Sequence, residues 1–362
     1  MHTTRGLNLK PQSLIFLTLL NILPTLAGRL EKSQLDLVEI MALSRKFYFL
    51  IFLLFGTLFV NIVAAKDRVH FLIPGGAGGG WDITARTVGE SLSRSGLIEI
   101  ASYENLSGGG GGRAIAYLIE TAPRQTNTLM VNSSSFILRS LLKKFSHNFR
   151  DLTPIASVIA DYGAFVVRID SPYATWHDIV EDYRRDHRQV NIAGGSSRGS
   201  TDHVVAALAF SKSGLNIRGL KYIPYNAGGQ AMVGLLSGES QILSTGLSEA
   251  VVLAKQGEVR IIAITAPERL SSFPDVPTLT EHGVDAVFAN WRGFFAPPDI
   301  SGNDIKAYED LIEQLLETES WQKKRLTRGW SHLHLSGKNF YTFLAEQEIE
   351  LTYLLNELGL QK

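Results

Sequence analysis

The chain has 362 residues, of which 45% are hydrophobic and 19% are charged, a balance that suits a globular protein of about two domains. Lysine and arginine together number 35, as do aspartate and glutamate, so no basic surplus indicates a nucleic-acid-binding protein. The sequence contains no cysteine, which excludes disulfide bonds, thiolate chemistry and a lipid-modified N-terminal cysteine.

The segment that begins at Met41 has the three parts of a signal peptide. Arg45 and Lys46 form a positively charged start, and Phe47–Phe55 is an uninterrupted apolar run. Small residues follow at Val63-Ala64-Ala65, where a signal peptidase would cut. This pattern predicts export, with the mature protein in the periplasm.

We therefore expect residues 41–65 to be a cleaved signal peptide, followed by a mature chain that starts near Lys66. The alternative is an uncleaved membrane anchor, because residues 47–65 approach the length of a membrane span. A signal peptide normally stands at the start of a chain, so we expect residues 1–40 to be an upstream extension, with Met41 as the true start.

From residue 66 onward, short β-type runs alternate with helical patterns, as is typical of βαβ units around a largely parallel sheet. The expected strands are 69–73, 98–103, 128–132, 155–159, 164–167, 190–193, 221–224 and 259–265. The expected helices are 82–94, 113–120, 201–211, 229–236, 304–317 and 340–358. The alternation fails at 155–167 and 290–298, where we expect the chain to cross between two lobes. The first lobe then comprises 66–165 and 291–362, and the second comprises 166–290.

Four segments rich in glycine or serine lie between an expected strand and an expected helix: Gly75–Trp81, Ser107–Gly112, Gly194–Gly199 and Asn226–Gly229. In open α/β sheets, ligands bind at the carboxyl ends of the strands. The free N–H groups at a helix N-terminus favour an anion there, and glycine lets the backbone approach it closely. Each loop alone could be a tight turn, but glycine loops in both expected lobes favour an anion-binding cleft.

Other ligand classes have little support in the sequence. No GxxxxGK[ST] motif is present, so a P-loop is excluded. A relaxed dinucleotide pattern occurs only at Gly109-x-Gly111-x-x-Ala114, and the residue that should be acidic for a ribose is Leu129. The closest histidine pair, His332 and His334, lacks the further ligands of a zinc site. We expect no cofactor and no metal.

One enzyme motif keeps an alternative function open. The segment Gly195-Ser196-Ser197-Arg198-Gly199 fits the G-x-S-x-G nucleophile elbow, between an expected strand and an expected helix. In a secreted serine hydrolase Ser197 would be the nucleophile, with Asp275 and either His282 or His334 as partners. The alternative meaning of the motif is a helix start rich in N–H and hydroxyl donors.

Taken together in chain order, these segments resemble the Bug family, the receptors of tripartite tricarboxylate transporters, and the TctC-like branch in particular. The matching segments are 74–82, 84–86, Asn105, 108–112, 194–196, 201–203, 225–229, 236–239, 262–270, 274–279 and 291–297. Each segment alone is a weak signal, whereas the ordered set spans most of 69–298. The resemblance implies an α/β, two-lobed periplasmic binding protein of the class II-like, Venus-flytrap type, with its ligand cleft between the lobes.

The resemblance also implies the function and the partners. We expect a non-enzymatic, monomeric receptor that captures a small carboxylate, a di- or tricarboxylate such as a citrate-like one. It would deliver this ligand to one small and one large membrane subunit of the transporter. The positions that match the family's ligand-binding loops are Gly79, Gly80, Trp81, Asp82, Ser133, Ser134, Ser196, Thr201, Asp202, His203 and Tyr225.

Several of these residues also suit purely structural roles. Asp82 stands where it can cap a helix, and Asp202 with His203 could be a cap and a packed imidazole. Arg198 occupies a position where the branch usually has glycine, and we include it among the expected ligand contacts because its guanidinium matches a carboxylate. Arg292 is better suited to an internal ion pair.

Overall fold

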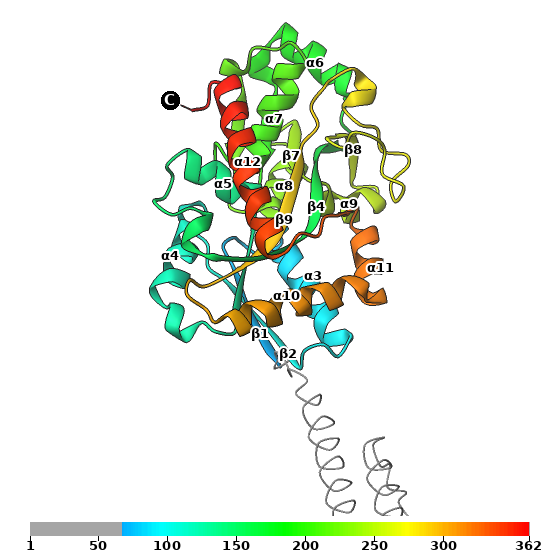
Figure 1. The fold of residues 1–362 in the computed structure, drawn as a ribbon. Helices are drawn as coiled ribbons and strands as arrows, with labels where there is room; N and C mark the ends of the chain where they lie inside the picture. The colour runs from blue at the N-terminus through cyan, green and yellow to red at the C-terminus, as the bar shows by residue number, and fades with distance from the viewer. Residues whose placement is uncertain (1–66, 362) are drawn as a thin grey trace, which may run out of the picture. The chain divides into compact units, whose positions relative to one another are not determined.

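The structure is a computed structural model that describes residues 67–361 (Figure 1). The predicted signal peptide at 41–65 and the predicted extension at 1–40 lie outside the described residues. Within 67–361, no helix combines the length and the apolar character that crossing a membrane requires.

The described residues form alternating strands and helices, as the sequence patterns predict. The strands are β1 (Arg68–Ile73), β2 (Ile100–Asn105), β3 (Thr128–Ser133), β4 (Thr153–Arg168), β5 (Asn191–Gly194), β6 (Lys221–Pro224), β7 (Ile242–Gly246), β8 (Val259–Ile264), β9 (Ala289–Ala296) and β10 (Ser331–His332). The helices are α3 (Gly80–Arg94), α4 (Gly112–Glu120), α5 (Ser134–Leu141), α6 (Trp176–Arg185), α7 (Thr201–Lys212), α8 (Gly228–Leu236), α9 (Leu247–Lys255), α10 (Gly302–Glu317), α11 (Glu319–Thr327) and α12 (Gly337–Glu357).

The first sheet has the strand order β2-β1-β3-β9-β4. β1, β2 and β3 are parallel, and β9 inserts antiparallel between β3 and β4. The apolar residues of β1 and β3 pack against α3 and α10, around Phe71, Val88 and Ile312. Parallel strands buried on both faces read as continuous apolar runs, which explains why β1 and β3 are readily predicted from the sequence.

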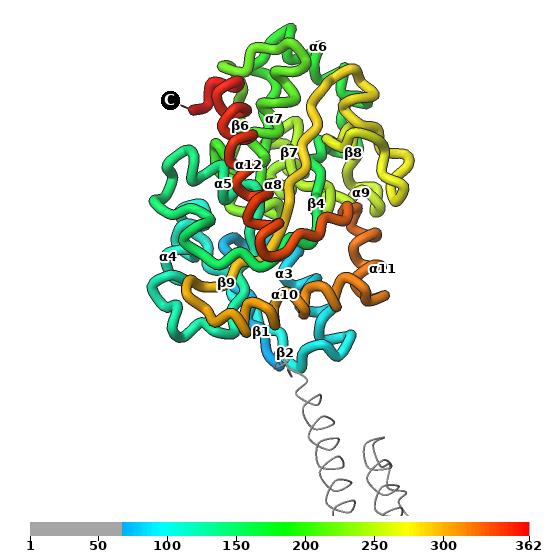
Figure 2. The backbone as a smooth tube through the Cα atoms, viewed as in Figure 1, coloured from blue at the N-terminus to red at the C-terminus, as the bar shows by residue number. Residues whose placement is uncertain are grey.

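The second sheet shares β4 with the first sheet. The N-terminal part of β4 pairs with β9, whereas the part from Gly163 onward pairs with β7 and β8. β5 and β6 continue this sheet beyond β7 as parallel neighbours. Figure 2 shows the result: the blue N-terminal strands share one half with the orange α10 and α11, and the other half holds the green and yellow segments.

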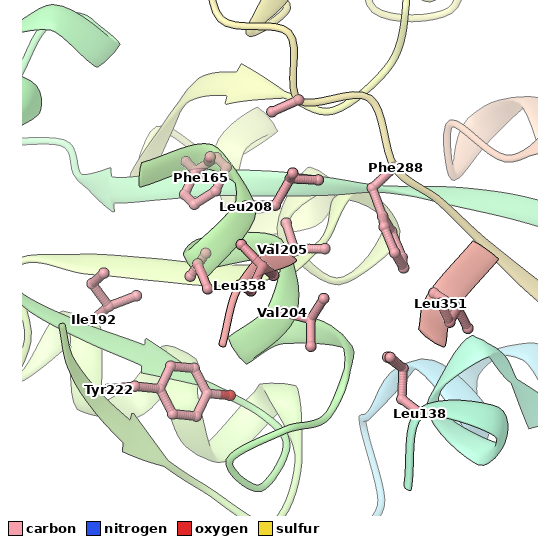
Figure 3. Packing of buried hydrophobic residues seen from close by; sticks show 14 of the residues in the cluster. Leu138, Phe165, Ile192, Val204, Val205, Leu208, Tyr222, Phe288, Leu351 and Leu358 are labelled. Carbon is pink, nitrogen blue, oxygen red and sulfur yellow. The ribbon is translucent and has the colours of Figure 1, made fainter. Parts of the chain in front are cut away.

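The last long helix contacts elements of both halves. α12 packs against α5 and β4, and its Leu351 and Leu355 belong to the same buried cluster as Val204 and Leu208 of α7. Figure 3 shows this cluster from close by. Lys212 at the end of α7 forms an ion pair with Glu357 at the end of α12, with Nζ 2.7 Å from Oε1.

The structure corrects the expected elements in two places. The two apolar runs predicted in 155–167 form one continuous strand, β4, because its residues pair with β9 over one part and with β7 and β8 over the next. The second expected crossing region contains the strand β9. The sequence patterns also gave no hint of the β7–α9 unit, which proves important for the site. The predicted lobe boundaries remain a prediction.

A cavity between two sets of strand ends

A cavity of about 340 Å³ lies at the carboxyl ends of strands from both sheets. All four glycine and serine segments predicted from the sequence contribute to its wall. The residues that line it are Pro74, Gly75, Gly76, Gly79, Gly80, Trp81, Ser107–Gly111, Ser133, Ser135, Arg139, Gly195–Ser197, Ser200–Asp202, Pro224–Gly228, Gly246, Glu249, Asn290 and Arg292. The helices α3, α7 and α8 therefore begin at the cavity, and their N-terminal dipoles favour a negative charge inside it.

Most of the predicted site residues are brought together at this cavity. Those that line it are Gly79, Gly80, Trp81, Ser133, Ser196, Thr201, Asp202 and Tyr225. Those outside its lining are Asp82, Ser134, Arg198 and His203. That any of them contacts a ligand remains a prediction.

Three of the four residues outside the lining, Asp82, Arg198 and His203, hold the glycine loops in place, whereas the hydroxyl of Ser134 has no hydrogen-bond partner among residues 67–361. Asp82 accepts the N–H of Gly78 at 3.0 Å and the side chains of Arg86 and Asn105, so it braces the first glycine loop. Arg198 donates from Nη2 to the carbonyl oxygen of Tyr222 at 2.7 Å.

His203 has a similar bracing role in the second sheet. Its Nδ1 accepts the N–H of Gly199 at 3.0 Å, which requires a neutral imidazole at that nitrogen. Burial, together with the positive charge of Arg198, lowers the pKa of His203 to about 4. The ring stays neutral at physiological pH and fixes the turn before α7.

Gly80, at the end of the first glycine loop, has no room for a side chain because Arg292 lies directly behind it. A Cβ at Gly80 would lie 2.1 Å from Nη2 of Arg292, so no other residue fits there without moving that guanidinium. Next to it, Trp81 donates from Nε1 to Oγ of Ser133 at 3.0 Å, which links the start of α3 to the end of β3. The loop therefore presents backbone to the cavity while its neighbours form a rigid wall.

Arg292 forms the internal ion pair that its sequence context favours. Its Nη2 lies 2.7 Å from Oδ2 of Asp161, and both side chains are buried. Nη1 donates to Oγ1 of Thr84 at 3.0 Å, and Oδ2 of Asp161 also accepts the hydroxyl of Ser248 at 2.6 Å. One network thus joins β9, β4, α3 and α9 beneath the cavity.

Loops from the two sheets touch beside the cavity. Oγ of Ser135, at the start of α5, hydrogen-bonds to Oγ of Ser200, just before α7. A Cβ at Gly76 or Gly79 would lie 3.2 or 3.4 Å from Cβ of Ala227. The cavity is therefore narrow at two points where the two sheets meet.

Arg139 is the cavity residue that the sequence reasoning missed most clearly. It lies in α5, is 4% exposed and lines the cavity. Its Nε and Nη1 are buried without a hydrogen-bond partner, and no carboxylate among residues 67–361 lies within ion-pair distance. Burial lowers the pKa of Arg139, an effect that Asp202 opposes. Arginine nevertheless stays charged at neutral pH.

Two acidic residues from the second sheet share the same wall. Asp202 lies in the first turn of α7, where Oδ2 accepts the hydroxyl of Ser196 at 2.9 Å. Glu249 lies in the first turn of α9, where it accepts the hydroxyl of Thr245 and the N–H of Gly246. Burial, together with the charge of Glu249, raises the pKa of Asp202 to about 7. Burial likewise raises the pKa of Glu249.

The sequence carried a usable signal for Arg139 but a poor one for Glu249. Arg139 follows three apolar residues, 136–138, so a helix through this segment must bury a charge or hold it against a site. Glu249 comes three residues after Gly246, a position typical of an ordinary helix cap. Only the fold shows that this cap faces a cavity.

Of the residues named for the hydrolase alternative, Asp275, His282 and His334 lie outside the lining of the cavity that contains Ser197. Ser197 lines the cavity, but the nearby His203 is occupied by the N–H of Gly199. His282 packs against the ring of His177, and Nδ1 of His334 lies 3.1 Å from the carbonyl oxygen of Ser157.

Comparison with known proteins gives one consistent result. The model of the family described as "Tripartite tricarboxylate transporter family receptor" matches residues 84–360. The protein BugT of Bordetella pertussis is 26% identical over 301 residues, which cover 80% of this chain and 89% of BugT.

Solved structures agree with this match at the level of the fold. The periplasmic binding protein BugD superposes with a TM-score of 0.74 at 20% identity, covering 82% of this chain and 98% of BugD. MatC from Rhodopseudomonas palustris, solved with bound malate, superposes with a TM-score of 0.69 at 19% identity, covering 80% of this chain and 99% of MatC.

Proposed function

The chain belongs to the tripartite tricarboxylate transporter receptor family, and on that premise we propose that it captures a small carboxylate in the cavity and delivers it to the membrane subunits of such a transporter. The family consists of solute-binding proteins and not of enzymes. We also propose that the receptor works in the periplasm, after removal of the predicted signal peptide.

The observation that carries this proposal is the convergence of helix N-termini on one cavity. α3, α7 and α8 all begin at its wall, and Gly79, Gly80 and Gly228 leave the first N–H groups of α3 and α8 open to close approach. Backbone N–H groups of this kind bind anions without a basic side chain. A carboxylate is the anion that agrees with the malate-bound relative.

The finer proposal is a di- or tricarboxylate, such as a citrate-like compound. Helix N-termini from both sheets and the unpaired Arg139 provide more than one place for a negative charge. The cavity of about 340 Å³ also lies at the small end of the range typical of ligand pockets.

A thermal-shift panel tests the proposal. The purified protein is heated with propionate, succinate, malate, adipate and citrate, and with succinamide as an uncharged control. A ligand present at 100 times its Kd should stabilise the folded state by about 2.7 kcal/mol, seen as a higher melting temperature. The proposal fails if no carboxylate raises the melting temperature above the succinamide control.

The aromatic wall offers a second, site-directed test. Trp81→Ala removes a half-buried ring that closes the cavity between β3 and α3. We expect roughly a tenfold loss of affinity for the selected carboxylate, or about 1.4 kcal/mol. Tyr117→Ala removes an exposed ring on α4 outside the cavity. This variant should bind the selected carboxylate as tightly as the unaltered protein does. Equal affinity for both variants would place the ligand elsewhere.

A further inference from the structure

The charged groups of the cavity wall are unevenly partnered. Arg292 is neutralised by Asp161 at 2.7 Å, whereas Arg139 has no carboxylate within ion-pair distance in the described part of the chain. An unpaired buried charge costs several kcal/mol, so such a residue is kept only where something compensates for it. Its planar fork matches a carboxylate in shape and charge.

The local structure holds Arg139 against the cavity. The loop Gly108–Gly111 covers its guanidinium so closely that a Cβ at Gly110 would lie 1.6 Å from Nη1. Arg139 is one turn along α5 from Ser135, which also lines the cavity. The arginine therefore cannot reach bulk solvent in the way that a long surface side chain does.

The second sheet contributes the opposite charge. Asp202 and Glu249 both line the cavity, and the charge of Glu249 acts on Asp202. The positive charges of Arg292 and Arg139 also act on Asp202, in the opposite direction. Asp202 accepts the hydroxyl of Ser196, and Glu249 accepts the hydroxyl of Thr245 and the N–H of Gly246. Among residues 67–361, no basic nitrogen lies within 4 Å of either carboxylate. When ionised, two carboxyl groups so placed repel a plain carboxylate and accept an O–H or N–H donor. Thr201, on the same wall, has a buried Oγ1 that finds no hydrogen-bond partner in the described part of the chain.

We infer that Arg139 binds a carboxylate of the ligand and that Asp202 and Glu249 accept a hydroxyl or ammonium group of the same molecule, so the cavity selects carboxylates that carry such a donor. This inference rests on the proposed function and narrows its substrate class. The glycine loops offer backbone donors at several places, whereas these three side chains fix the orientation of the ligand, with its carboxylate toward α5 and its donor group toward α7 and α9.

A matched series of four-carbon ligands tests the inference by calorimetry. Succinate has no donor, malate adds a hydroxyl group, and aspartate adds an ammonium group. A hydrogen bond to a charged group contributes about 1.5–3 kcal/mol, so malate or aspartate should bind about ten- to a hundredfold more tightly than succinate. A stronger effect of aspartate identifies the ammonium as the donor, and a stronger effect of malate identifies the hydroxyl. If succinate binds as tightly as both, the inference is wrong.

Variants separate the two ends of the ligand. Arg139→Met should weaken all three ligands about ten- to a hundredfold, whereas Arg185→Met, an exposed position on α6, should change nothing. Glu249→Gln should reduce the advantage of the donor-bearing ligand over succinate. Unchanged binding by Arg139→Met would overturn the inference.

Thermal stability distinguishes ligand binding from a structural role. If Arg139 had a structural role, Arg139→Met would destabilise the protein. If Arg139 is an unpaired buried charge, the ligand-free Arg139→Met variant should be as stable as the unaltered protein, or more stable. A large drop in melting temperature for Arg139→Met would therefore contradict the inference. If the carboxylate panel selects a ligand with a different number of carbon atoms, the matched ligand series is made with that number of carbon atoms. Failure of the entire panel would instead contradict the proposed function itself.

Discussion

Gly110 and Arg139 depend on each other at the scale of single residues. Gly110 has a φ of 70°, in the left-handed region that favours glycine, and the space where a side chain would begin is filled by the arginine. Both the backbone conformation and the close contact require glycine at this position. The loop shapes the cavity indirectly, by fixing the place of a guanidinium on another element.

Gly110→Ala should therefore reduce ligand affinity through Arg139. The methyl group would meet the end of a flexible side chain, so the guanidinium should move and lose its alignment, costing about tenfold in affinity, or about 1.4 kcal/mol. Calorimetry with the selected carboxylate measures this loss.

Gly214→Ala is the matched control. Gly214 has nearly the same φ, 72°, but has no neighbouring atom within 4 Å of the added methyl group. It should show the backbone strain as a lower melting temperature without the loss of affinity. If both variants lose affinity equally, strain and not Arg139 is responsible.

At the scale of elements, the network around Arg292 and Asp161 ties two crossing strands to two helices. Arg292 lies on β9 and Asp161 on β4, and their further partners Thr84 and Ser248 lie on α3 and α9. Each of these helices begins at the cavity wall, or next to it. The ion pair thus fixes the starts of two helices that belong to different sheets.

Breaking this pair at one side should be costly. Asp161→Asn leaves a buried guanidinium without its counter-charge, and we expect a loss of about 3–5 kcal/mol in the free energy of unfolding. Denaturation in urea measures it. The double variant Asp161→Asn with Arg292→Met removes both charges and should be less destabilised than the single variant. A single-variant loss below about 1 kcal/mol would mean that water screens the pair.

The elements best predicted from the sequence are those with local signals. Strands β1, β3 and β6 and helices α3, α7 and α10 follow from apolar runs, helical periodicity and glycine loops, and the resemblance to the family identifies the fold. The strand β9 was missed inside the expected crossing region 290–298, because its partners β3 and β4 lie more than a hundred residues earlier in the sequence. Of the two acidic residues of the cavity, Asp202 was predicted as a site residue, but Glu249 was missed for the same reason: it comes near Asp202 only after β7 pairs with β4 and β5.

At the scale of the whole molecule, the raised pKa of Asp202 links stability to pH. Its pKa rises from 3.8 to about 7 on folding, so between these values the folded protein binds more protons than the unfolded chain. Its contribution to stability is therefore present below about pH 4 and is lost as the pH rises to about 7. His203, whose pKa is lowered to about 4, has the opposite effect between about pH 4 and 6.5.

The prediction therefore concerns the difference in free energy of unfolding between the unaltered protein and Asp202→Asn. Urea denaturation at several values from pH 4.5 to 7.5 gives the free energy of unfolding of the ligand-free protein and of Asp202→Asn. The advantage of the unaltered protein over Asp202→Asn should shrink steadily as the pH rises, because asparagine does not titrate. A constant difference would show that Asp202 keeps an ordinary pKa in the folded state.

Because loops of the two sheets meet beside the cavity, we expect the protein to become more compact when it binds its ligand. Donor groups come from both sheets, and Ser135 contacts Ser200 across the gap, so a ligand should draw the two sets of loops together. Small-angle scattering should show a smaller radius of gyration with ligand than without. Ala227→Leu places a larger side chain between the glycine loops and should reduce this decrease. An unchanged radius at confirmed saturation would contradict a hinged cleft.

The insertion of β9 between β3 and β4 also sets the order in which the protein can fold. β3 ends at Ser133, but its partner β9 begins only at Ala289, roughly 160 residues later. At a synthesis rate of about 5–20 residues per second, β3 waits about 8–30 seconds for that partner. Contacts so distant in sequence make folding slow. A circular permutant that begins near β9 would bring β9 closer in sequence to β3 but move it farther from its other partner, β4, so we expect it to refold no faster than the natural order.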